Sequence, residues 1–184
     1  MLPANPTAID YLRDIIRYNL NLAEDRVNVY NQKFNIPSDP YLFIGVEYKM
    51  SKVYGSKSEF TTDNNVFNEH QGLNTQEHFA ILVFSRNTDA LTRKEEIVQA
   101  LGSVYARQLG DTYGFKIARI APIQDVSGTE GAAILYKFEI GVVMLCRYEK
   151  SIPIAFYGTF PIQATVADGV TTITPEITEP APLP

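Results

Sequence analysis

The chain has 184 residues, of which 45% are hydrophobic and 20% charged, proportions that suit one folded domain with a tail. Its formal net charge of −5 and pI of about 5.1 leave no basic surface for holding phosphates, which argues against sequence-specific binding of DNA or RNA. The single cysteine, Cys146, excludes an intramolecular disulfide. Met1 to Pro6 has no signal-peptide pattern and no apolar stretch reaches membrane-spanning length, so we expect a chain made in the cytoplasm.

A helix is predicted to begin near Thr7, where Thr7 can cap free amides and Asp10 lies at the positive end of the helix. Its apolar stripe has helical spacing and needs a surface to pack on. The stripe consists of Ile9, Leu12, Ile15, Ile16 and Leu20. Partial alternation then indicates a short strand over residues 27–31.

The next strand is predicted over residues 41–50, after a proline-containing loop at Ile36 to Pro40. Its apolar residues recur with period two on one face. They are Leu42, Ile44, Val46, Tyr48 and Met50. The polar residues 51–75, with Gly55 and Gly72 as breaks and 61–65 as a loop, suggest a hairpin.

Residues 77–85 are apolar on both faces from Phe79 to Phe84, which predicts a central strand covered on both sides. One long helix is expected from about Thr88 to Leu109, with a stop between Gly110 and Gly114. Its apolar side should consist of Ala90, Ile97, Val98, Leu101, Val104, Tyr105 and Leu109.

Two further strands are predicted, over residues 115–120 and 134–148, with Pro122 either ending the first of them or placing it at a sheet edge. The intervening Ser127 to Gly131 is expected to be a flexible connection. It could be mistaken for a phosphate loop, but it lacks the Gly-Lys-Ser/Thr ending and precedes a strand instead of a helix.

The composition changes after Lys150, because no Lys or Arg follows, whereas Asp168, Glu176 and Glu179 add negative charge. Residues 169–184 are rich in Thr, Ile and Pro, which favours extended chain. Such an arm is either disordered or completed by a partner, most simply by adding a strand to a neighbour's sheet edge. We therefore divide the chain into an α+β domain at 1–160 and an extended acidic C-terminal arm at 161–184.

Two acid–histidine pairs, Glu69-His70 and Glu77-His78, are the candidates for metal ligands, since carboxylates and imidazoles bind zinc and manganese. Their spacing matches no metal-binding frame such as H-E-x-x-H, and we interpret them as loop and strand-edge residues. Neither His70 nor His78 has a nucleophile context, and Cys146 lies in an apolar strand that disfavours its thiolate. We expect no catalytic, cofactor-binding or metal-binding residue and no enzymatic activity.

Three segments together resemble a family of structural proteins from the neck of tailed bacteriophages, the tail-terminator or head–tail joining proteins. They are Leu91 to Leu109, Phe115 to Ile120 and Val126 to Phe138, and a weaker likeness runs over residues 7–160, including Phe34 to Pro37. The resemblance implies a tail-terminator-like α+β fold, with a mixed or largely antiparallel sheet flanked by two main helices. It transfers no functional residue.

The resemblance also implies a function, namely a homo-hexameric ring in the virion, assembled in the cytoplasm of the host bacterium. The ring would join the head and portal-adaptor complex to the tail. Its partners would be a head-completion or adaptor protein and the tail tube or sheath proteins, with no membrane contact. An acidic ring would let DNA pass without holding it. The alternatives are a tube or baseplate subunit, or a small metal-dependent enzyme using the His70 and His78 region.

Overall fold

The computed structural model describes residues 6–30, 39–63, 66–130, 133–154, 162–167 and 170–175. It divides into two compact units, one of residues 1–55 and 74–148 and one of residues 56–73 and 149–184. The expected boundary between residues 160 and 161 stays a prediction. Several segments that carried expectations lie wholly or partly outside the described residues: 34–38, 64–65, 131 and 176–184.

The first unit is α+β, and its described part contains three α-helices and a mixed sheet. Helix α1 (Ala8–Leu20) begins as predicted, where the backbone amide and the hydroxyl of Thr7 both donate to the Asp10 carboxylate at 3.0 and 2.7 Å. The predicted apolar stripe of α1 is buried from Leu12 to Leu20, and Ile9 is partly buried beside it. The 3-10 helix η1 (Glu24–Arg26) follows and leads into strand β1 (Val27–Val29).

Strands β2 (Phe43–Asp63) and β3 (Val66–Ser85) are neighbours in the sheet, which agrees with the expected hairpin. The breaks expected at Gly55 and Gly72 are wrong, because both glycines lie inside these long strands. In β3 the predicted burial of both faces is confirmed. Phe79, Ile81 and Val83 belong to the main core, while Leu82 and Phe84 form a second cluster with Phe43.

The single helix expected over 88–109 is wrong, since the chain forms α2 (Asp89–Leu101) and α3 (Val104–Tyr113). Gly102 stabilises helix poorly, and the Ser103 side chain accepts a hydrogen bond from the Ala106 amide at 3.1 Å, so a new helix begins there. This break leaves Val104 65% exposed, although the sequence placed it on the apolar side. The helix stop predicted between Gly110 and Gly114 is confirmed, since α3 ends at Tyr113 and the cap residue Gly114 adopts φ 71°.

Strand β4 (Phe115–Ile120) has the predicted bounds and pairs antiparallel with β7 (Ala133–Ile154), which is longer than predicted. The flexible connection expected at Ser127 to Gly131 is wrong in its described part. There β6 (Gly128–Glu130) pairs with β7, as does β5 (Gln124–Asp125) just before this stretch. Backbone pairing with a strand close in sequence outweighs the turn propensity of this glycine- and serine-containing stretch.

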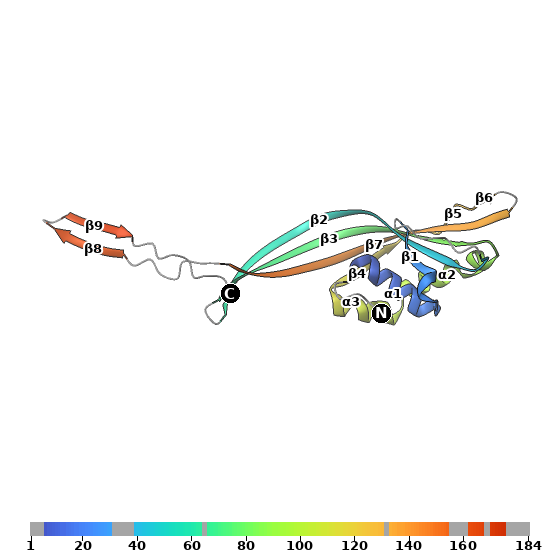
Figure 1. The fold of residues 1–184 in the computed structure, drawn as a ribbon, viewed down its shortest axis with the longest axis horizontal. Helices are drawn as coiled ribbons and strands as arrows, with labels where there is room; N and C mark the ends of the chain where they lie inside the picture. The colour runs from blue at the N-terminus through green and yellow to red at the C-terminus, as the bar shows by residue number, and fades with distance from the viewer. Residues whose placement is uncertain are drawn as a thin grey trace. The chain divides into compact units, whose positions relative to one another are not determined.

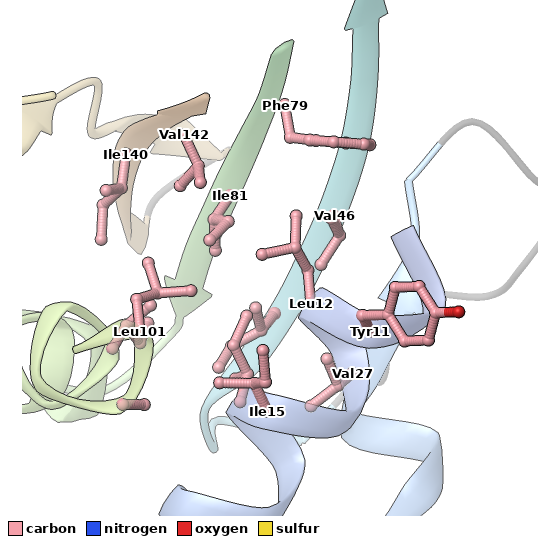
Figure 2. Packing of buried hydrophobic residues seen from close by; sticks show 14 of the residues in the cluster. Tyr11, Leu12, Ile15, Val27, Val46, Phe79, Ile81, Leu101, Ile140 and Val142 are labelled. Atoms are coloured by element: carbon pink, nitrogen blue, oxygen red, sulfur yellow. The ribbon is translucent and has the colours of Figure 1, made fainter. Parts of the chain in front are cut away.

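The seven-stranded sheet has the order β1-β2-β3-β7-β4, with β5 and β6 also bonded to β7, and its β1–β2 pair is parallel. The mixed sheet is thus confirmed, whereas three helices replace the expected two. All three lie on one side of the sheet (Figure 1). Figure 2 shows Leu12 and Ile15 of α1 packed towards Val46, Ile81 and Val142 of the strands.

The second unit contains the continuations of β2, β3 and β7 and a separate two-stranded sheet. In it the Ser58 hydroxyl donates to Glu69 at 3.0 Å, and the Thr61 hydroxyl lies 2.7 Å from His70 Nε2. Strand β8 (Ile162–Ala167) pairs antiparallel with β9 (Val170–Pro175). Part of the expected extended arm therefore pairs with itself.

Candidate assembly site

A stretch of β2 in the first unit has no strand paired to its outer edge. Strand β1 pairs only with Ile44, Gly45 and Val46, so Glu47–Gly55 has β3 on one side and no paired strand on the other within the described residues. We call Glu47–Gly55 the open β2 edge. An uncovered edge presents backbone N–H and C=O groups that can pair with another chain.

The open β2 edge is rich in large apolar side chains that contact solvent. The exposed fractions are 45% for Tyr48, 51% for Met50, 56% for Val53 and 56% for Tyr54. The sequence correctly placed Tyr48 and Met50 on the face that Ile44 and Val46 share, but on β2 the buried core ends at Val46. Contiguous exposed apolar groups are typical of protein–protein contact surfaces.

Two contacts show which face each residue of the open β2 edge occupies. The Tyr48 ring meets Phe79 edge-on, with centroids 5.9 Å apart, and Phe79 belongs to the core beneath the helices. At the far end, a Cβ on Gly55 would lie 3.5 Å from Asn74 Nδ2. Phe79 is an odd-numbered and Asn74 an even-numbered residue of β3, so they lie on opposite faces. Tyr48 thus faces the same side of the sheet as Phe79, and Gly55 faces the same side as Asn74. Period-two alternation also predicts opposite faces for residues 48 and 55, so the alternation runs unbroken between them.

The charges of the open β2 edge are mainly positive. The Lys49 ammonium lies 2.6 Å from the Glu47 carboxylate, and this hydrogen bond raises the pKa of Lys49. Lys52 is exposed and makes no ion pair or hydrogen bond with any residue in the described part of the chain. One uncompensated cation thus lies in the middle of the open β2 edge.

Strand β4, at the other side of the sheet, carries a groove of about 650 Å³ between itself and α3. The outer edge of β4 has two features that oppose pairing with a further strand. The register shifts between Ile117 and Arg119, and Lys116 and Arg119 are exposed along it. A bulge and outward cations are features that discourage strand addition. The open β2 edge is therefore the better site for a partner strand.

A buried polar cluster lies on β3 and β7 of the first unit. Glu77, 8% exposed, accepts hydrogen bonds from the Tyr148 hydroxyl at 2.6 Å and the Thr75 hydroxyl at 3.1 Å. Burial and the hydrogen bond to Glu77 raise the pKa of Tyr148. Burial, assisted by the Glu77 charge, raises the pKa of Cys146 to about 12, so its thiol stays protonated at neutral pH.

The two acid–histidine pairs of the sequence are separated by the fold. Glu69 and His70 bond to Ser58 and Thr61 in the second unit, whereas in the first unit Glu77 is buried and His78 Nε2 lies 3.1 Å from Gln76 Nε2. Among the described residues, no group of three or more His, Cys, Asp or Glu side chains could hold a metal ion. The interpretation of Glu69 and His70 as loop residues is wrong, since both lie in β3, and that of Glu77 as a solvated strand-edge residue is wrong, since it is buried.

Comparisons with known proteins leave the chain without an assigned relative: no family model matches it, and no curated protein matches it significantly. Among the described residues, no helix combines the length and the apolar character needed to cross a bilayer. The class that the structure establishes is an α+β protein with a mixed sheet.

Proposed function

We propose that the chain is a structural virion protein that forms a ring in the neck of a tailed phage. In this role it joins the head and its portal-adaptor complex to the tail and lets DNA pass. The observation that carries the proposal is the open β2 edge, where backbone groups that are unpaired within the described residues run beside four exposed apolar residues, three of them on one face. A ring needs a surface that binds a different surface of the next copy, and a sheet edge offers such a head-to-tail contact.

Two further observations support the proposal. The segments Leu91 to Leu109 and Phe115 to Ile120, which carry the resemblance to neck proteins, form α2, α3 and β4 of the first unit. The net charge of −5 suits a channel through which DNA moves, because adhesion to phosphates requires clustered cations. In this role the chain acts through contacts with its own copies and with neighbouring virion proteins, without chemical catalysis.

The test begins with the purified chain, whose mass in solution is measured over a range of concentrations while negatively stained samples are imaged. We expect self-association into six-fold rings with a central hole. Closed dimers, or rings without a hole, would contradict the proposal.

A second measurement places the protein in the particle. A gold-labelled antibody against the chain is applied to the virions whose genome encodes it. Labelling at the junction of head and tail is expected. Labelling along the tube or at the baseplate would instead support another tail component, and virions without the protein would exclude a structural role in the particle.

A further inference from the structure

We propose that residues 176–184 of a second copy add to the open β2 edge as an antiparallel strand. The inference rests on the self-association contained in the proposed function. It identifies the surface through which copies join and the segment that occupies it.

The free backbone groups of the open β2 edge belong to its even-numbered residues. The Tyr30 amide donates to the Val46 carbonyl at 2.9 Å, so Val46 points its backbone groups towards β1. In a strand, alternate residues direct their N–H and C=O to opposite sides. Beyond the reach of β1, four residues therefore point their backbone groups to the unpaired side: Tyr48, Met50, Lys52 and Tyr54.

The prolines of residues 176–184 would make this segment one-sided if it were extended. The sequence is Glu-Ile-Thr-Glu-Pro-Ala-Pro-Leu-Pro, and the prolines occupy positions 180, 182 and 184 only. In an extended chain all three would fall on one side, which would then lack donors from Pro180 onward. The other side keeps every N–H group, on Ile177, Glu179, Ala181 and Leu183. Such a strand can form hydrogen bonds with a neighbour on one side only, so it would be the outermost strand of the sheet. Prolines within sheets occur in such edge strands.

Charge selects the register in which the two sets of backbone groups pair. Antiparallel pairing that uses all four places Glu179 opposite Lys52, the cation that lacks a partner among the described residues. Parallel pairing would place Glu179 opposite Met50. The other antiparallel pairs join apolar side chains: Ile177 with Tyr54, Ala181 with Met50, and Leu183 with Tyr48.

Cross-linking of the full chain tests this register. Equal amounts of isotopically heavy and light protein are mixed, and a carbodiimide then couples neighbouring amines to carboxylates. We expect a Lys52–Glu179 isopeptide, found in heavy–light pairs in the proportion that random mixing predicts. The same link confined to one isotope would place it within a single chain and overturn the inference.

A matched pair of variants tests the one-sided strand. Ile177→Pro removes an N–H from the pairing side, whereas Thr178→Pro adds a proline to the side that already carries prolines. Ile177→Pro is expected to lower the yield of the Lys52–Glu179 link about tenfold, and Thr178→Pro to leave it unchanged. Equal yields in the two variants, or no Lys52–Glu179 link in the unaltered chain, would overturn the inference.

Imaging the same samples separates this inference from the ring itself. Rings that form without the Lys52–Glu179 link leave the proposed function standing and refute the strand addition. Linked heavy–light pairs without rings would refute the ring while supporting the strand addition.

Discussion

The Tyr148 hydroxyl donates a hydrogen bond to the buried Glu77 carboxylate at 2.6 Å, which ties β7 to β3 close to the open β2 edge. With the Thr75 hydroxyl at 3.1 Å, it gives the acid two donors in an otherwise apolar layer. A buried acceptor that loses a donor costs more than the same loss at the surface.

Tyr148→Phe should therefore destabilise the protein by about 1–3 kcal/mol, because Glu77 keeps only the Thr75 donor. Urea denaturation measures the change. Tyr54→Phe removes a hydroxyl from a side chain that is 56% exposed and serves as the control, with little expected effect. Equal losses of unfolding free energy in the two variants would mean that the Tyr148–Glu77 hydrogen bond stabilises the fold no more than an exposed hydroxyl does.

A second prediction concerns the close approach of α3 and β4. A Cβ on Gly110 would lie 2.5 Å from the Phe115 carbonyl oxygen, a backbone atom that cannot move aside without shifting a strand. Gly110→Ala should destabilise the fold by about 1–3 kcal/mol through overpacking. At Gly102 the nearest atoms are 3.7 Å away, so Gly102→Ala should be neutral or stabilise by up to about 1 kcal/mol. Thermal unfolding of both variants gives the comparison, and an unchanged Gly110→Ala protein would contradict this packing.

A third prediction is a loss of stability at alkaline pH. The Tyr105 hydroxyl is part-buried and donates to Asp14 at 2.6 Å, and burial together with this bond raises its pKa from 10.0 to about 12. The folded state thus holds the proton more tightly than the unfolded state, so stability is full below pH 10 and falls as the pH rises towards 12. Denaturation curves from pH 9 upward should show a shallower fall for Tyr105→Phe than for the unaltered chain. If stability falls equally steeply with pH in Tyr105→Phe and in the unaltered chain, ionisation of Tyr105 is not the cause of the alkaline loss.

A fourth prediction addresses self-association. Tyr54→Lys places a second charge beside Lys52 and removes an exposed aromatic side chain, so it should weaken assembly about tenfold or more. Sedimentation at several concentrations measures the association constant. The control is Val104→Lys on α3, which changes a residue 65% exposed and should leave assembly unchanged. Both variants should unfold at the same denaturant concentration as the unaltered chain. If Val104→Lys weakens assembly as much as Tyr54→Lys, the open β2 edge is not the contact surface.

The sequence predicted α1, β4 and the burial of both faces of β3, because each depends on a local pattern that repeats within a few residues. It missed the break between α2 and α3, although Gly102-Ser103 carries the local signal of a helix end followed by a cap. The pairing of Gly128 to Glu130 with β7 was missed because the turn propensity of this stretch predicted a connection, although the partner residues Ala133 to Leu135 follow closely in the chain.

The candidate site was visible only in part. Period-two alternation put Tyr48 and Met50 on the same face as Val46, and the arm at residues 169–184 was expected to be either disordered or completed by a partner. What the sequence could not show is that β1 ends at Val29 and the core at Val46, so that in the described part of the chain no strand pairs with the outer edge of the next nine residues of β2.

The sequence alone thus determined which side of each element is apolar and where most elements begin, because these properties depend on residues adjacent in the chain. The tertiary structure alone decided which apolar faces are covered and which edges are paired. Coverage depends on partners distant in the sequence: Val46 packs beneath α1, whereas Tyr54, eight residues on along the same strand, is exposed. The same period-two pattern therefore builds a core at one end of β2 and an exposed apolar surface further along it.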